Sequence, residues 1–355
     1  MTHIPSKQTP KEYALNPNPQ RIVDDLLPHR VPAHESASAF APANIALCKY
    51  WGKRNEPLKL PLTGSLSVSL GDLGTRMTLR VSDQDRLHIN QIEQPPESKA
   101  FSRLFSFIDL FRKPGTCLAI ESINTIPMSA GLASSASAFA ATVHTLNALY
   151  DWKLNDSQRS ILSRIGSGSA SRSVYHGFVE WFPGEQDNGM DSYAESLNVR
   201  WPEIRVGILT LSNAEKPIGS SEGMKRTLET SVLYRSWPDQ VKQDLPVIRE
   251  AIYQKDFPLL GKTAEQNAMS MHATMIAAWP PILYWRPESL ETLHKVHRLR
   301  EKGVDVFATM DAGPNVKILF TEESTAAVKE AFPDVRIVAP FSDSESYCNR
   351  SGIPF

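Results

Sequence analysis

The chain has 355 residues, of which 41% are hydrophobic and 22% charged, a composition typical of a globular protein with room for two domains. Lys and Arg together number 38 and Asp and Glu 39, so the overall charge favours neither a nucleic-acid partner nor a membrane surface. Three cysteines without metal-ligand spacing, no signal segment and no apolar run of about 20 residues predict a soluble, cytoplasmic protein.

Residues 1–35 show little periodic pattern and are predicted to form a poorly ordered arm. Ile22, Val23, Leu26 and Leu27 could form one helical turn within it. Alternation and helical spacing then predict strands at 66–70, 77–81, 118–123, 177–182 and 205–211, and helices at 99–111, after residue 135 and at 156–165. Gly166 is predicted as the C′ residue that ends the last of these helices.

The second half is predicted to be mostly helical, followed by alternating strands and a helix. Helices are expected at 239–254, 258–278, 289–302 and 322–332, and strands at 304–310, 316–320 and 335–339. This order indicates a layered α+β protein. The predicted units are the arm (1–35), a first domain (36–195) and a second domain (196–355), separated near a polar, turn-rich stretch at 184–191.

Pro127 to Phe139 is a candidate phosphate loop. Gly131 and its small neighbours would let backbone N–H groups approach an anion, and the helix that follows adds the positive end of its dipole. The alternative is an ordinary Ser/Ala-rich helix start with serines as N-caps, and composition alone does not decide between the two. The segment is not a Walker loop, because no Lys follows the glycine.

Three further segments carry candidate functional residues, and the first two gather polar groups suited to anions. Ala41 to Arg54 carries Asn44, Lys49 and Lys53, although such lysines also occur on ordinary amphipathic stretches. Arg164 to Trp181 places several serines around Arg172, which suits a diphosphate or carboxylate but also a polar connection.

The third such segment is Ala308 to Phe320. It puts Asp311 on a turn between two strands, where a carboxylate could act as a base or simply open the turn.

Taken together, these segments resemble the diphosphomevalonate decarboxylase family of the GHMP kinase superfamily. PMSAGLASSA resembles the phosphate loop of the superfamily, and NIALCKYWGK, RIGSGSASRS and DAGPN resemble motifs particular to the decarboxylases. A further stretch, Asn267 to Tyr284, also matches, and the likeness runs from about Phe40 to Phe320. It implies a two-domain α+β GHMP kinase fold, with a ribosomal protein S5 domain 2-like first domain and a ferredoxin-like second domain.

The resemblance also implies an activity, ligands and roles for individual residues. The activity is ATP-dependent decarboxylation of mevalonate 5-diphosphate through phosphorylation of its 3-hydroxyl, with ATP and Mg²⁺ as cofactors and homodimeric assembly. The catalytic residues would be Asp311, Lys49, Arg172 and Asn44. Substrate would be bound by Tyr50, Lys53, Ser167, Ser169, Arg172 and Lys99. ATP would be bound by Ser129, Ala130, Gly131, Leu132, Ala133, Ser134, Ser135, Ala136, Ser220 and Ser221, with Ser135 also at the magnesium ion.

Several rival functions remain open at this stage. A relative could use mevalonate 5-phosphate, or phosphorylate mevalonate at the 3-hydroxyl without decarboxylation. Gly219 to Gly223 fits the G-x-S-x-G pattern of a serine hydrolase, but a nucleophile elbow must directly follow a strand. His294 and His297 share a helix face and could bind a metal, although neighbouring Lys and Arg residues oppose a cation.

Overall fold

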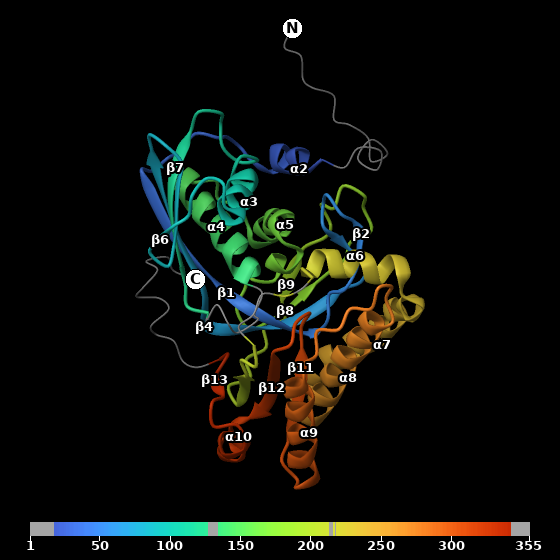
Figure 1. Ribbon diagram of the computed structural model, residues 1–355. Helices are drawn as coiled ribbons and strands as arrows, with labels where there is room; N and C mark the ends of the chain where they lie inside the picture. Colours follow the sequence, from blue (N-terminus) through green and yellow to red (C-terminus); the bar gives the residue numbers. More distant parts are fainter. Residues whose placement is uncertain (1–17, 127–133, 213–215, 217, 342–355) are drawn as a thin grey trace.

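The computed structural model describes residues 18–126, 134–212, 216 and 218–341. Its frame consists of two sheets and a short hairpin (Figure 1). The larger sheet has the order β6-β5-β7-β4-β8-β9, with β1 paired to β4, and contains β1 (Ser36–Cys48), β4 (Ser65–Ser82), β5 (Arg86–Ile89), β6 (Ile92–Glu93), β7 (Cys117–Asn124), β8 (Phe178–Trp181) and β9 (Ala194–Ser196). The smaller sheet has the order β11-β12-β10-β13 and contains β10 (Ile204–Ile208), β11 (Val306–Met310), β12 (Val316–Thr321) and β13 (Arg336–Val338). The hairpin joins β2 (Lys53–Asn55) and β3 (Leu60–Pro61).

The two predicted strands at 66–70 and 77–81 are parts of one strand, β4. Its even-numbered residues from Leu66 to Leu70 are buried against the second half of the chain, whereas Met77 and Leu79 are buried against helices of the first half. Between these two stretches the pairing with β1 is irregular, and Gly71 has a φ of 58°. Because even- and odd-numbered residues of a strand face opposite sides of the sheet, β4 supplies apolar side chains to the cores on both faces.

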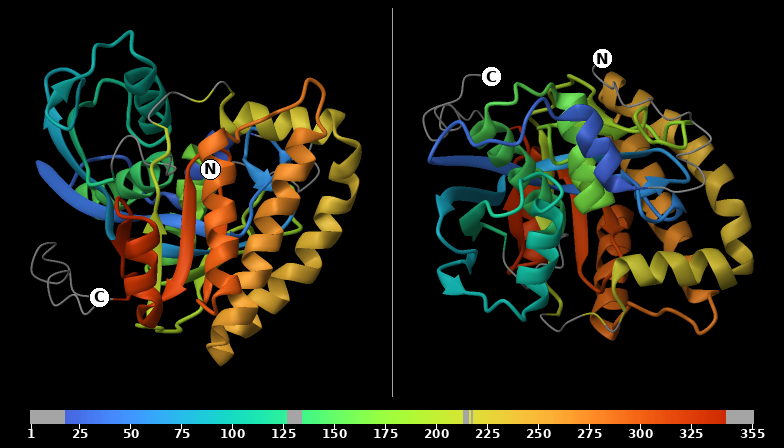
Figure 2. Two further views of the ribbon diagram at one scale, coloured as in Figure 1. Left: turned by 60° about the horizontal axis from the view of Figure 1, so that its bottom comes forward. Right: turned by 90° about the horizontal axis from the view of Figure 1, so that it is seen from above.

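Helices of the first half cover one face of the larger sheet (Figures 1 and 2). They are α2 (Pro19–Leu26), α3 (Lys99–Ile108), α4 (Ser134–Tyr150) and α5 (Asp156–Gly166). Gly166 is not the C′ residue that was predicted, because it is the last residue of α5 and Ser167 caps the helix. A Cβ added at Gly166 would lie 2.3 Å from the ring of Phe139, so this glycine serves the close packing of α5 on α4.

The other face of the larger sheet packs on the second half. There, α7 (Trp237–Gln254) and α8 (Phe257–Ile276) pack on each other and on β1, and α8 and α9 (Pro287–Glu301) also contact β11 (Figure 2). The remaining helices are α6 (Ser220–Thr230) and α10 (Thr325–Ala331), with short 3₁₀ turns η2 (Gly168–Ser171), η3 (Val232–Ser236) and η4 (Glu322–Ser324). One continuous apolar core thus joins the larger sheet to the second half, which places the end of β1 beside the end of β11.

The mixture of helices and sheets confirms the predicted α+β class. Within the segment predicted to be a poorly ordered arm, residues 19–26 form α2, and Ile22 and Val23 are fully buried, as their apolar pattern indicated. Residues 1–17 lie outside the described part of the chain. In the residues that the structure describes, every helix is too short or too polar to cross a membrane.

Candidate active site

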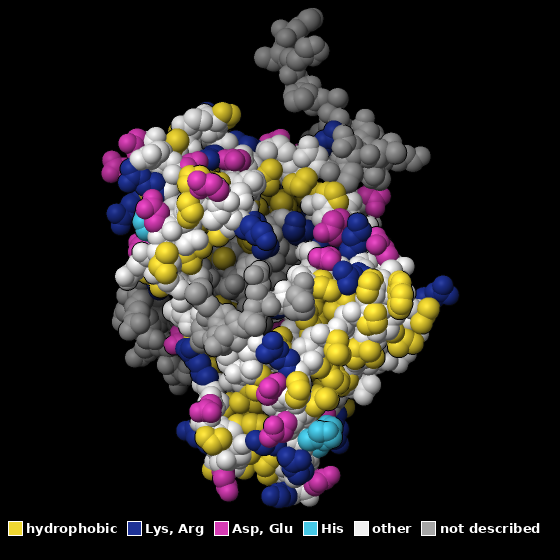
Figure 3. All heavy atoms as spheres, viewed as in Figure 1, with side chains coloured by type: hydrophobic (Ala, Val, Ile, Leu, Met, Phe, Trp, Pro, Cys, Tyr) yellow, Lys and Arg dark blue, Asp and Glu magenta, His cyan; other side chains and the backbone are white. Residues whose placement is uncertain are grey.

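A cavity of about 700 Å³ lies where the two halves of the chain meet, and both halves line it. In a space-filling view, Lys and Arg side chains gather around the hollow at the centre of the molecule (Figure 3). Most residues predicted for the site line this cavity: Asn44, Lys49, Tyr50, Lys53, Ser135, Ser167, Ser169, Arg172, Ser220, Ser221 and Asp311.

Some of the predicted residues are not placed in the cavity. Ser129, Ala130, Gly131, Leu132 and Ala133 lie outside the described residues, and Ser134 is described only as the first residue of α4. Ala136 is buried and does not line the cavity. Lys99 begins α3 and is also absent from the lining, whereas Arg103, one turn further along the same helix, lines it.

The centre of the site is an ion pair between the two halves. Lys49 follows the last residue of β1, and Asp311 follows the last residue of β11. The Lys49 Nζ lies 3.0 Å from Asp311 Oδ1, and the Nζ of Lys317, on β12, lies 3.4 Å from Asp311 Oδ2. Both lysine side chains are 2% exposed, while that of Asp311 is 27% exposed toward the cavity. The carboxylate therefore reaches the cavity with a buried cation behind each of its oxygens.

These charges set the protonation of Asp311. Burial alone would raise the pKa of Asp311, but the positive charges of Lys49 and Lys317, a hydrogen bond from Lys49 and the charge of Lys216 together hold this pKa well below its usual range. Burial lowers the pKa of Lys49, and the charge of Asp311 opposes that shift. We conclude that Asp311 is ionised at neutral pH and is a hydrogen-bond acceptor that is hard to protonate.

A buried arginine forms the next part of the cavity wall. Arg172 follows η2, is 2% exposed, and donates to Ser65 Oγ at 2.5 Å and to Asn44 Oδ1 at 3.4 Å. Asn44 in turn donates to Ser173 Oγ at 2.8 Å. Burial lowers the pKa of Arg172 to about 10, so the guanidinium stays charged at neutral pH. Within the described residues its Nε has no hydrogen-bond partner.

A second group of cations also lines the cavity. Lys53 pairs with Glu56 at 2.6 Å and donates to Ser221 Oγ at 3.3 Å. Lys59 and Arg103 line the same region, and burial lowers the pKa of both side chains. The carboxylates of the lining are those of Glu56 and Asp311, so the cavity as a whole is cationic.

Sequence reasoning missed Lys59, Arg103, Lys317, Lys216 and Ser65. Arg103 could have been found one turn after Lys99 within the predicted helix, because residues four apart share a helix face. Lys317 gave a weaker indication, as a lysine in an otherwise apolar strand whose burial requires a nearby carboxylate.

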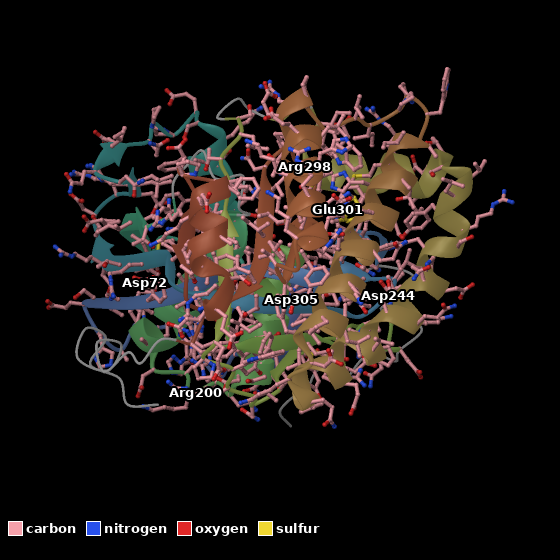
Figure 4. The ribbon with its side chains drawn as sticks, turned by 90° about the horizontal axis from the view of Figure 1, so that it is seen from below. Asp72, Arg200, Asp244, Arg298, Glu301 and Asp305 are labelled. Carbon is pink, nitrogen blue, oxygen red and sulfur yellow. The ribbon has the colours of Figure 1, made fainter. Side chains whose placement is uncertain are left out.

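The low pKa of Asp311 predicts how stability depends on pH. A carboxylate whose folded pKa lies below its unfolded value of about 3.9 stabilises the fold above that value, and this stabilisation is lost as the pH falls toward the folded pKa. The unfolding free energies of the parent and Asp311→Asn are therefore expected to begin to converge below about pH 5 and to converge further as the pH falls below about 3.9. Denaturant titrations across this range would measure the gap, and Asp305→Asn, at an exposed carboxylate before β11, is the control (Figure 4). A difference in unfolding free energy between the parent and Asp311→Asn that does not change with pH would contradict the low pKa assigned to Asp311.

Two rival sites receive no support from the geometry. Gly219 is the N-cap of α6, and Ser220 and Ser221 begin that helix well after the end of β10 at Ile208, so the strand-turn-helix of a nucleophile elbow is not formed. His297 Nε2 lies 3.8 Å from Glu265, but within the described ranges no group of three His, Cys, Asp or Glu side chains could hold a metal ion.

Comparison with known proteins identifies relatives along most of the chain. Residues 41–194 match the family model of the diphosphomevalonate decarboxylase-like N-terminal domain, and residues 206–351 match that of the mevalonate 5-diphosphate decarboxylase C-terminal domain. The diphosphomevalonate decarboxylase of Gibberella zeae is 38% identical over 319 residues, covering 83% of this chain and 84% of the relative. The human diphosphomevalonate decarboxylase is 38% identical over 327 residues, covering 84% and 81%.

Solved structures agree in fold with this assignment. The mevalonate diphosphate decarboxylase from Staphylococcus aureus superposes with a TM-score of 0.81 at 36% identity, covering 86% of this chain and 95% of that one. A structure described as MDDEF in complex with MVAPP, AMPPCP and magnesium superposes with a TM-score of 0.80 at 38% identity, covering 86% and 96%. On these matches, the chain belongs to the diphosphomevalonate decarboxylase family and has its two-domain GHMP kinase fold.

Proposed function

We propose that the protein catalyses the ATP-dependent decarboxylation of mevalonate 5-diphosphate to isopentenyl diphosphate, with release of ADP, phosphate and carbon dioxide. The observation that carries this proposal is the buried Lys49–Asp311 pair at the wall of a cationic cavity, in a chain of this family. An ionised carboxylate beside a set of cations suits phosphoryl transfer to a hydroxyl of a polyanionic substrate.

The residues of the cavity fit two phosphorylated ligands. About 700 Å³ lies within the usual range of small-molecule sites, and the cations of the lining outnumber its carboxylates. The hydroxyl of Tyr50, which lines the cavity, is buried without a partner among the described residues and could donate to a ligand oxygen. The first turn of α4 at Ser134 and Ser135 adds backbone N–H groups that have no acceptor within the helix, and a positive dipole end.

A magnesium ion bound with ATP also fits this lining. Mg²⁺ in nucleotide sites usually takes only one or two protein ligands and fills its shell with phosphate oxygens and water. The absence of a carboxylate cluster in the described cavity wall is compatible with that mode, with the Ser135 hydroxyl as the protein ligand. When bound, the ion would neutralise charge on the phosphate oxygens.

Asp311 would accept a hydrogen bond from the 3-hydroxyl of the substrate and point that oxygen at the phosphorus atom. Its low pKa makes it a weak base, but phosphoryl transfer through a loose transition state needs orientation more than early proton removal. Lys49, fixed 3.0 Å from Asp311, would stabilise negative charge at the reacting oxygens. Asn44 would hold Arg172 in place through the hydrogen bond between them.

The second step is fragmentation of the phosphorylated substrate. The bond from C3 to the phosphorylated oxygen breaks, and phosphate leaves with its electron pair. The bond between C2 and the carboxylate carbon also breaks, and its electron pair forms the new double bond between C2 and C3. Arg172, with Ser167 and Ser169, would hold the carboxylate and diphosphate until carbon dioxide leaves. The diphosphate would be bound by Lys53, Lys59 and Arg103, and not by Lys99 as the sequence predicted. The nucleotide would lie near Ser220 and Ser221.

A comparison of three substrates tests this proposal and separates its rivals. Purified protein with ATP and magnesium would be given mevalonate 5-diphosphate, mevalonate 5-phosphate or mevalonate, and initial rates of ADP release would be measured. We expect the diphosphate to have the highest kcat/KM, because shorter substrates would bring less negative charge to the Lys53, Lys59 and Arg103 group. A higher kcat/KM for the monophosphate or for mevalonate would contradict the proposed substrate.

Three expectations from the sequence remain predictions: homodimeric assembly, a cytoplasmic location and a division between domains near residue 195. Sedimentation of the purified protein would test the first, and fluorescence microscopy of a tagged chain the second. Expression of residues 196–355 alone would test whether that part folds independently.

A further inference from the structure

We infer that α8 positions the reacting pair of the proposed decarboxylase. Through Asn267 it holds the backbone of Lys49, and through His272 it holds the backbone of Asp311, with Trp285 selecting the ring nitrogen of His272 that carries the proton. The inference rests on the proposed function, because it assigns these residues a role in aligning groups for that reaction.

The hydrogen bonds of His272 define its tautomer. The side chain is 1% exposed, and its Nδ1 lies 2.9 Å from the indole Nε1 of Trp285. An indole N–H can only donate, so Nδ1 is the acceptor and the proton of the neutral ring is on Nε2. That nitrogen lies 3.1 Å from the backbone carbonyl oxygen of Asp311 and donates to it. The opposite tautomer would set two donors against each other at Trp285 and two acceptors at Asp311.

Burial and neighbouring positive charges keep His272 neutral. Burial, the positive charge of Lys49 and, to a lesser extent, that of Lys317 lower the pKa of His272 to about 3. The carbonyl and carboxylate of Asp311 favour protonation but do not prevail. A neutral imidazole can therefore anchor the Asp311 backbone without adding a cation that would compete with Lys49 for the carboxylate.

Asn267 anchors the other partner. Its side chain is fully buried, its Oδ1 accepts the backbone N–H of Lys49 at 2.8 Å, and its Nδ2 donates to Asp244 Oδ2 at 2.7 Å. Asp244 belongs to α7 and is itself held by Gln240 at 2.8 Å (Figure 4). The amide of Asn267 is thus oriented by α7, and its oxygen can only face Lys49.

Both anchors belong to one rigid element. Asn267 and His272 lie five residues apart on α8, about 7.5 Å along the helix axis. Lys49 and Asp311 come from different sheets, so their 3.0 Å separation depends on how the two halves pack. A single helix bonded to the backbone at both residues removes that dependence and fixes the pair before substrate binds.

The test compares two substitutions of His272. His272→Leu removes the donor, leaves the Asp311 carbonyl unpaired and should lower kcat about 10- to 100-fold with each KM within about threefold of the parent. His272→Gln, whose amide nitrogen can take the place of Nε2, should recover most of the lost kcat. A role in packing alone predicts the opposite result, with lower thermal stability in both variants but kcat per folded molecule within twofold of the parent.

A second measurement does not depend on turnover. Nitrogen-15 NMR of labelled histidine, assigned with the His272 variants, should show unprotonated Nδ1 and protonated Nε2 at His272 between about pH 5 and pH 8. Trp285→Phe, which retains an aromatic ring, should weaken this preference and lower kcat about threefold, and it replaces His272→Leu if that variant does not fold.

The outcomes separate the two proposals. A protonated Nδ1 in the parent, or an active parent whose His272→Leu and Trp285→Phe variants keep full kcat, would overturn the inference alone. A parent with the expected tautomer but no release of ADP or carbon dioxide would instead overturn the proposed function, and with it the role of α8 in that reaction.

Discussion

Asp311→Asn is expected to lower kcat for carbon dioxide release by at least about a thousandfold. Asn keeps the shape of the side chain and can still contact the 3-hydroxyl, but it removes the negative charge that lies between Lys49 and Lys317. The amide also presents a donor where the hydroxyl proton must point. The nucleophilic oxygen would then lose both its orientation and its acceptor, while substrate would still be bound by the cations of the cavity.

The measurement is single-turnover release of carbon dioxide, with KM determined in the steady state. KM for the substrate should change little, because in the proposed complex the diphosphate group would contact Lys53, Lys59 and Arg103 rather than Asp311. Asp305→Asn, an exposed carboxylate in the connection to β11, is the matched control and should retain parental kcat. Retention of more than about a tenth of kcat in a folded Asp311→Asn would contradict the role given to Asp311.

Arg172→Lys is expected to lower kcat/KM for the diphosphate substrate about 100- to 1000-fold, although the charge is kept. The guanidinium is buried, donates to Ser65 and Asn44 at the same time, and leaves Nε for a ligand. A lysine ammonium is a single point of charge and cannot span these three directions. Both the position of the substrate carboxylate and that of Asn44 would change.

Steady-state kinetics with varied substrate and saturating ATP would measure this effect. KM for ATP should stay within about threefold of the parent, since Arg172 is assigned to the substrate and not to the nucleotide. Arg298→Lys, at an exposed arginine on α9, is the matched control (Figure 4). Equal losses of kcat/KM for both ligands would contradict the division of the cavity proposed here.

Much of the site could be predicted from sequence because its residues cluster in short motifs. Arg172 with its neighbouring serines, and Lys49 with Asn44, each lie within a few residues of one another, so these motifs can be matched to those of a known family before the fold is known, although the residues alone left other interpretations open. Only the fold shows which of these motifs face each other across the cavity. Lys49 and Asp311 are 262 positions apart, and their 3.0 Å contact depends on the core that joins β1 to β11.

The site residues that were missed are hard to predict from the sequence, for physical reasons. Lys317 and His272 look like single polar residues on buried elements, and their roles appear only when Asp311 is placed beside them. Arg103 was missed because helical spacing places Lys99 and Arg103 on one face of the helix but does not show which of the two reaches the cavity. The continuity of β4 was missed because the stretch around Gly71, where its pairing with β1 is irregular, interrupts the apolar alternation on which strand predictions rest.

The most direct test of the proposed reaction follows ADP and carbon dioxide together in one mixture of purified protein, ATP, magnesium and carboxyl-labelled mevalonate 5-diphosphate. The proposed mechanism predicts equal amounts of the two products at every time after the first turnover, because each phosphorylation leads to one fragmentation. ADP formed without carbon dioxide would contradict it and would identify a kinase that stops at the phosphorylated substrate.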